Sequence, residues 1–244
     1  MEYLILVVSL ALIIFGAMLL TDGSVALAGR FRVPEFIVGL TIVAVGTSMP
    51  ELTVSFISAL NGESAMAIGN VVGSNIFNVL AILGVCAVFS PILFTKTNIR
   101  RDIPICILAS MALLFVTLLH HDITRWEGLI LLVGYVTMIL YTIRSDRKAM
   151  VEAGCNIEEQ HKRMPMWRVP IWIIAGLAGL IFGGDLFVSS ATDIAKSLGV
   201  SEAVIAITLV AGGTSLPELA SSLVSIFKGS PSLALGNVLG SNIA

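Results

Sequence analysis

The chain of 244 residues is 57% hydrophobic and 12% charged, with a mean hydropathy of +0.98 and a formal net charge of −2. Soluble domains carry about 25% charged residues, so this composition excludes an ordinary soluble protein and predicts an integral membrane protein in a lipid bilayer. The basic residues lie in short runs between apolar segments and form no stripe, which excludes a nucleic-acid partner. The three cysteines have neither an even count nor metal-ligand spacing, so they indicate no disulfide framework.

Apolar segments of membrane-spanning length follow one another along most of the chain. A helix needs about 20 mostly apolar residues to cross a bilayer. Seven segments approach this length, at residues 3–20, 34–60, 64–90, 103–119, 128–143, 168–190 and 203–227. An eighth begins near Ser232, and the polar stretch 144–167 is too short for a folded domain. The sequence therefore predicts an all-α fold, a polytopic bundle of membrane helices.

The chain contains an internal repeat. The motif GTSMPE at 46–51 returns as GTSLPE at 213–218, at a constant offset of 167 residues. Residues 46–76 and 213–243 agree at 17 of 31 positions. Agreement at a single offset over this length indicates two copies of one structural unit.

The repeated segments also share a glycine-asparagine pair, Gly69-Asn70 in the first copy and Gly236-Asn237 in the second. Each pair opens a Gly-x-x-x-Gly motif, which ends at Gly73 or Gly240. Small residues at this spacing let two membrane helices approach closely. We therefore predict that these glycines serve helix packing.

The two copies are predicted to have opposite orientations in the membrane. When the connecting segments are counted alternately, only Arg125 and Lys196 fall on one side. The other twelve basic residues fall on the opposite side: Arg30, Arg32, Lys96, Arg100, Arg101, Arg144, Arg147, Lys148, Lys162, Arg163, Arg168 and Lys228. Cytoplasmic loops carry the excess of Lys and Arg, so the side with twelve should be cytoplasmic and the N-terminus outside.

Five predicted spans precede the second copy, and an odd number of crossings inverts it. We expect a first five-helix repeat at 1–143 and a cytoplasmic loop at 144–167. The second, inverted repeat occupies 168–244 and is incomplete in its third helix. Inverted repeats with interrupted helices are typical of secondary transporters.

Each copy places a glutamate directly after a proline within an apolar span. An ionisable side chain near the bilayer centre costs roughly 3 kcal/mol and usually marks an ion pathway. Pro50 and Pro217 have no N–H to give to the preceding turn, so each helix must break and free backbone carbonyls. Hydroxyls, carbonyls and a carboxylate within a short stretch are hard oxygen ligands, which Na⁺, Ca²⁺ and Mg²⁺ prefer.

Structural interpretations of the same residues remain open at this point. A single Thr, Ser or Asn in a membrane helix often only hydrogen-bonds a neighbouring helix. Glu51 or Glu218 could be a protonated acid with a structural partner, although no Lys, Arg or His lies nearby in sequence. Recurrence of the whole pattern in both copies favours an ion site.

The segments GTSMPEL and GTSLPEL, followed by GNVVGSNIF and GNVLGSNIA, resemble the alpha repeats of the sodium/calcium exchanger family, most closely its prokaryotic members. The resemblance implies two inverted five-helix halves, with four ion sites between the second, third, seventh and eighth helices, in a prokaryotic inner membrane. It implies Na⁺ and Ca²⁺ as partners and no cofactor beyond these transported ions. The implied ligands are Ala44 (carbonyl), Thr47, Ser48, Glu51, Ser74, Asn78, Ala211 (carbonyl), Thr214, Ser215, Glu218 and Ser241.

The function that follows from the resemblance is antiport of Na⁺ against Ca²⁺ by alternating access. An alternative is a proton-coupled cation antiporter, in which Glu51 or Glu218 takes H⁺ in place of Na⁺. A cation channel is a further alternative, but the chain has no filter-like loop. An enzyme is not expected, since no Ser/His pair or His cluster lies in a span. The oligomeric state is left open.

The repeat offset also leads to an expectation about the end of the chain. It places the counterpart of Asn78 directly after Ala244, where the family resembled carries an acidic or amide ligand. Only 13 residues run from Ser232 to Ala244, fewer than the 20 or so that cross a bilayer. We therefore expect Asp, Glu or Asn next and further spans beyond, and no coupled flux from these 244 residues alone.

The predicted topology can be tested at Cys155, in the loop expected to be cytoplasmic. With Cys86 and Cys106 replaced by serine, Cys155 should react with a membrane-impermeant maleimide only after the cells are permeabilised. Labelling of intact cells from outside would reverse the predicted orientation.

Overall fold

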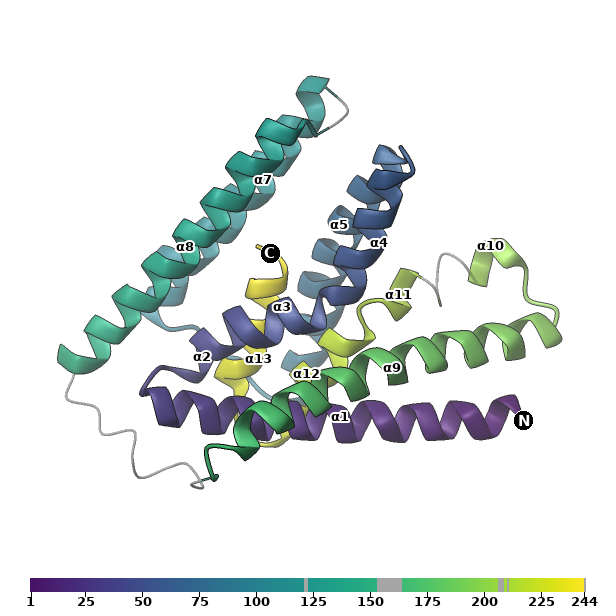
Figure 1. The fold of residues 1–244 in the computed structure, drawn as a ribbon, viewed down its shortest axis with the longest axis horizontal. Helices are drawn as coiled ribbons and strands as arrows, with labels where there is room; N and C mark the ends of the chain where they lie inside the picture. The colour runs from purple at the N-terminus through teal and green to yellow at the C-terminus, as the bar shows by residue number, and fades with distance from the viewer. Residues whose placement is uncertain (121–122, 153–163, 206–208, 210, 244) are drawn as a thin grey trace.

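The computed structural model describes residues 1–120, 123–152, 164–205, 209 and 211–243, and the regular structure in these ranges is helical (Figure 1). Within them, five helices are long and apolar enough to cross a membrane: Glu2–Phe31, Ser64–Phe89, Asn98–Leu118, Arg125–Asp146 and Arg168–Ser197. A sixth crossing is a bent pair, Glu35–Thr47 with Met49–Leu60. The predicted all-α membrane bundle is thus confirmed. Cys155 lies outside the described residues.

The first repeat is built as a long helix, a broken span and three further spans. Its elements are α1 (Glu2–Phe31), α2 (Glu35–Val38), the π-helical turn η1 (Gly39–Val43), α3 (Ala44–Thr47), α4 (Met49–Leu60), α5 (Ser64–Phe77), the π-helical turn η2 (Asn78–Ile82), α6 (Leu83–Phe89), the π-helical turn η3 (Asn98–Asp102), α7 (Ile103–His120) and α8 (Arg125–Glu152).

Two of these helices are longer than their predicted spans. α1 was expected to end near residue 20 but continues to Phe31, where Arg32 takes a left-handed conformation (φ 52°) ahead of Pro34. α8 continues to Glu152, inside the stretch 144–167 expected to be a loop. Hydrophobicity marks the bilayer-crossing part of a helix, whereas its ends are set by capping and by proline. The cytoplasmic position of 144–167 stays a prediction.

The second repeat reproduces the first at the level of the backbone. Its elements are α9 (Arg168–Ser197), α10 (Glu202–Ile205), α11 (Ala211–Gly213), α12 (Leu216–Phe227) and α13 (Pro231–Ser241). Gly62 and Gly229, which are repeat mates, both have positive φ, 78° and 80°, in the turn after the broken span. Only glycine adopts this conformation without strain, so the same residue occurs in both turns.

The long helices α1 and α9 run antiparallel, side by side, along the lower edge of the bundle (Figure 1). A Cβ atom on Gly16 would lie 2.8 Å from the Leu180 nitrogen, and one on Gly176 would lie 2.5 Å from the Leu20 nitrogen. Backbone therefore touches backbone along a glycine seam between α1 and α9. Close approach of this kind replaces side-chain interdigitation in membrane helix pairs.

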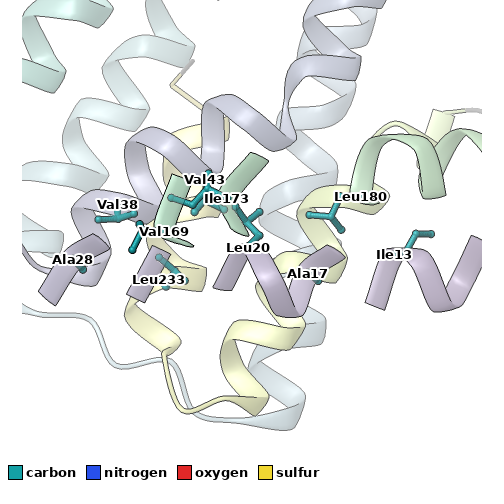
Figure 2. Packing of buried hydrophobic residues seen from close by; sticks show 10 residues of the cluster. All are labelled: Ile13, Ala17, Leu20, Ala28, Val38, Val43, Val169, Ile173, Leu180 and Leu233. Atoms are coloured by element: carbon teal, nitrogen blue, oxygen red, sulfur yellow. The ribbon is translucent and has the colours of Figure 1, made fainter. Parts of the chain in front are cut away.

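Buried apolar side chains extend this helix pair into a core, drawn in Figure 2. The core brings side chains of the second span and of α13 onto α1 and α9. Its members are Ile13, Ala17, Leu20, Ala28, Val38, Val43, Val169, Ile173, Leu180 and Leu233. Val38 and Val43, which precede the motif in the broken span, therefore pack on α1 and α9.

The halves meet again where α13 crosses η1. A Cβ on Gly240 would lie 2.5 Å from the Leu40 carbonyl oxygen, and one on Gly236 would collide with the Phe36 carbonyl oxygen. The predicted packing role of the second glycine motif is thus confirmed. At Gly69 and Gly73, a Cβ would meet no atom within 4 Å among the described residues, so the role of the first motif stays a prediction.

Polar contacts join α1 to α12 as well. The Lys228 Nζ lies 2.6 Å from the Asp22 Oδ1, and the Thr21 and Ser225 hydroxyl oxygens lie 3.2 Å apart. The ion pair is partly exposed, whereas the hydroxyl pair is fully buried.

The backbone contact between α1 and α9 predicts a large loss of stability when one methyl group is added there. Gly176→Ala should destabilise the full-length protein by about 1–3 kcal/mol, because the new Cβ must displace the α1 backbone. Thermal unfolding in detergent measures this loss. Gly134→Ala in α8 is the matched control, since a Cβ there meets nothing described within 4 Å and alanine favours helix. Equal destabilisation by both variants would contradict the seam.

Candidate ion-binding site

The repeated motif sits at a break in each copy. α3 ends at Thr47, α4 begins at Met49, and the two helix segments are bent by 48°. Ser48 at the break has φ −81° and ψ 10°, and Ser215 at the corresponding break has φ −90° and ψ 8°. This sparsely populated backbone region recurs in functional sites. The predicted interruption of both spans is confirmed.

The helix α9 supports both breaks. A Cβ on Gly46 would lie 2.5 Å from a methyl carbon of Leu177, and one on Gly213 would collide with a methyl carbon of Val188. The first glycine of each motif is therefore needed so that the broken span can lie against α9. One long helix thus holds the two motifs in position relative to each other.

The two glutamates are buried and are paired across the repeats. Glu51 is 8% exposed and Glu218 is 1% exposed. The Ser215 hydroxyl donates to the Glu51 Oε1 at 2.9 Å, and the Ser48 hydroxyl donates to the Glu218 Oε1 at 2.8 Å. Each serine therefore binds the glutamate of the other copy, which brings residues 164 and 170 positions apart into one cluster.

The second oxygen of each carboxylate has no hydrogen-bond donor. Glu51 Oε2, Glu218 Oε2, Asn78 Oδ1 and Ser241 Oγ are buried without a partner in the described part of the chain. An unpaired buried polar atom costs about 1–3 kcal/mol. All four are oxygen atoms, the kind of ligand that binds a hard cation.

Charged side chains do not neutralise this cluster. Within the described ranges, no Lys, Arg or His pairs with Glu51 or Glu218, and no group of three or more His, Cys, Asp or Glu could hold a metal. Two carboxylates with hydroxyl and amide oxygens form a set suited to Na⁺ or Ca²⁺, not to a soft metal.

The remaining implied ligands lie at the two breaks or on α5. Thr47 is fully buried, with its hydroxyl 3.0 Å from the Val43 carbonyl oxygen, and the Ala44 carbonyl accepts the Ser48 N–H at 3.0 Å. The Ser74 hydroxyl donates to the Asn70 carbonyl oxygen at 2.9 Å. Ala211 begins α11, and Thr214 follows its last residue.

Sequence reasoning missed two asparagines at the site. The Asn70 amide donates to the Glu51 carbonyl oxygen at 3.0 Å and to the Ser55 hydroxyl at 2.9 Å. The Asn237 amide makes the corresponding contact with the Glu218 carbonyl oxygen at 3.4 Å. Their recurrence beside Gly69 and Gly236 is the signal in the sequence that points to them.

A bent membrane span and its interrupted counterpart in the second repeat meet around a cluster of buried oxygens, and this arrangement defines a cation carrier of the antiporter class. The family model described as sodium/calcium exchanger protein matches residues 1–144 and 168–244. The chain belongs to this family. Its members are transporters, which supports a non-enzyme role.

Similar proteins cover nearly the whole chain. The putative antiporter CaxA of Alkalimonas amylolytica is 38% identical over 97% of this chain and 75% of its own length. The sodium/calcium exchanger MaX1 of Methanosarcina acetivorans is 30% identical over 99% of this chain and 79% of its own. A structure of the sodium-calcium exchanger NCX_Mj has a TM-score of 0.84 at 31% identity, with 100% of this chain and 78% of that one covered. This match confirms the inverted-repeat fold.

A cation that binds the unpaired oxygens should stabilise the folded state. At a Ca²⁺ concentration of about 100 times the dissociation constant, binding adds about 2.7 kcal/mol of stability. We therefore expect Ca²⁺ to raise the unfolding temperature of the full-length protein, and Glu218→Gln to remove most of the rise. Glu63→Gln, an exposed acid between α4 and α5, should keep it. A rise unchanged in Glu218→Gln would place Ca²⁺ elsewhere.

Proposed function

We propose that the protein exchanges Na⁺ for Ca²⁺ across the membrane by alternating access. The observation that carries this proposal is the crossed pairing of Ser48 with Glu218 and of Ser215 with Glu51. It joins the two inverted halves around buried carboxylates that have no positively charged partner in the described structure.

The ligand chemistry supports Ca²⁺ as one of the transported ions. Ca²⁺ takes six to eight oxygens in flexible geometry, and Glu51 and Glu218 together match its charge. Mg²⁺ needs a stricter octahedron and loses its water reluctantly. The proposed ligands are Ala44, Thr47, Ser48, Glu51, Ser74, Asn78, Ala211, Thr214, Ser215, Glu218 and Ser241.

The charge of the cluster supports obligatory exchange. Two ionised carboxylates in a low-dielectric interior repel each other, and their desolvation is costly unless cations neutralise them. A change of access without bound ions would bury both charges unpaired. The halves therefore rock only when Ca²⁺ or several Na⁺ ions are bound, and because these ions compete for the same oxygens, entry of one requires release of the other.

Relatives support the identity of the ions and the location. MaX1 is named a sodium/calcium exchanger, and YrbG of Escherichia coli, 32% identical over 98% of this chain and 75% of its own length, is named an inner membrane protein. We infer a prokaryotic inner membrane for this protein, with its N-terminus outside because the basic residues gather on the other side.

The test is ⁴⁵Ca²⁺ uptake into proteoliposomes that contain the full-length protein and are loaded with Na⁺. Uptake should follow the outward Na⁺ gradient and stop when that gradient is abolished; parallel runs with and without K⁺ show whether K⁺ takes part. Uptake driven by a pH gradient in Na⁺-free medium would instead establish a proton-coupled cation antiporter. A flux of ions per protein molecule far above the turnover rate of a carrier would indicate a channel.

The two glutamates should be indispensable for exchange. Glu51→Gln and Glu218→Gln should each lower Na⁺-driven ⁴⁵Ca²⁺ uptake by about 100-fold or more, because each removes half of the buried negative charge. Folding of each variant is checked by size-exclusion chromatography.

Glu35→Gln and Glu202→Gln, at the first residues of α2 and α10, are controls with the same chemical change and should retain most of the activity. Robust exchange by either Glu51→Gln or Glu218→Gln would refute the two-carboxylate site.

A further inference from the structure

We propose that Asn237 is a positioning residue of the ion site, which from the opposite repeat helps the Val43 carbonyl oxygen to set the direction of the Thr47 hydroxyl proton. The inference rests on the proposed function, because it treats Thr47 as a cation ligand. Asn237 is 1% exposed and lies in α13, whereas Thr47 is fully buried at the end of α3. The Thr47 Oγ1 and Asn237 Oδ1 are 3.2 Å apart.

The hydrogen bonds of the Asn237 NH₂ group fix the orientation of the amide. This group lies 2.9 Å from the Ser221 Oγ and 3.0 Å from the Ser222 Oγ. The Ser221 hydroxyl gives its own proton to the Glu218 carbonyl oxygen, at 3.1 Å, so it must accept from Asn237. The nitrogen of the amide therefore faces α12, and its oxygen faces Thr47.

The position of the Thr47 proton follows from this orientation. Two oxygen atoms at 3.2 Å attract each other only when a proton lies between them, and the Asn237 oxygen has none to give. The Thr47 hydroxyl is therefore the donor in this contact, and it shares its one proton between the Asn237 oxygen and the Val43 carbonyl oxygen, which lies 3.0 Å away. Its lone pairs then remain available for a cation beside Glu218, whose carboxylate lies close to this hydroxyl.

Removal of the Asn237 amide takes away one acceptor of the Thr47 hydroxyl proton. Without its acceptor in α13, the Thr47 proton is held by the Val43 carbonyl oxygen alone, so the hydroxyl turns more easily to the nearby Glu218 carboxylate, where its proton occupies an oxygen that a cation would use. Cation binding must then break this charge-assisted bond. The affinity for Ca²⁺ should fall, and it should fall only while Thr47 carries a hydroxyl.

The first repeat provides a natural control. Asn70 makes the same type of contact with its own glutamate and with Ser55, both of the first repeat. At the position equivalent to Ser221 the first repeat has Val54, which cannot accept an amide hydrogen. Asn70 therefore serves as the comparison for Asn237, since it holds the glutamate carbonyl and the serine of its own repeat.

The experiment is a double-mutant cycle in which Ca²⁺ binding to the purified full-length protein is measured by equilibrium dialysis. With Thr47 present, Asn237→Ala should raise the dissociation constant for Ca²⁺ by about threefold or more. In the Thr47→Val background, it should raise this constant by less than about 1.5-fold. Such non-additivity is expected of residues in direct contact. Asn70→Ala should have the same effect in both backgrounds. Thr47→Ser, which keeps the hydroxyl, should restore the full effect of Asn237→Ala.

The outcomes separate this inference from the proposed function. Equal effects of Asn237→Ala in both Thr47 backgrounds would show a merely structural role and overturn the inference. The predicted coupling together with an absence of Na⁺-driven flux would uphold the inference and reject the exchange. Absence of Ca²⁺ binding to the wild-type protein would overturn both. Should Asn237→Ala not fold, Asn237→Ser, whose hydroxyl is too short to reach Thr47, replaces it in the same cycle.

Discussion

Two carboxylates buried in an apolar bundle, without a positively charged side chain beside them in the described structure, are the constraint from which this architecture follows. Their charge has to be met by neutral donors or by mobile cations, since the bilayer supplies no water. Ser48 and Ser215 each satisfy one carboxylate oxygen, and the second oxygen has no hydrogen-bond partner among the described residues. The breaks, the glycines and α9 serve to bring these few oxygens together.

Much of this could be predicted from the sequence, because proline and glutamate within an apolar span break rules that membrane helices otherwise obey. The constant offset then predicted the second half. The pairing across repeats could not be predicted: within either copy the serine lies three positions before the glutamate, and nothing local indicates that Ser48 binds Glu218 and not Glu51. The same applies to Asn237, whose partner Thr47 is 190 residues away.

The two halves are related by sequence but are not equivalent in their contacts. The ion pair of Asp22 with Lys228 joins α1 to α12. The repeat offset places Ser189 and Asn61 at the corresponding positions, and these two side chains cannot form an ion pair. An exposed pair of this kind contributes about 0–1 kcal/mol, enough to favour moderately the conformation in which α1 and α12 touch.

Ordinary core positions adjust to mutation in pairs, with a larger residue on one element offset by a smaller one on its neighbour. Gly16 and Gly176 have no such freedom, since each faces the backbone of the other helix and neither can become smaller. The distance and angle between α1 and α9 are thereby fixed, and substitutions in related sequences can hardly change them. Adaptation of the carrier to another membrane or temperature is left to surfaces where side chains meet, such as the contact of α1 with α12.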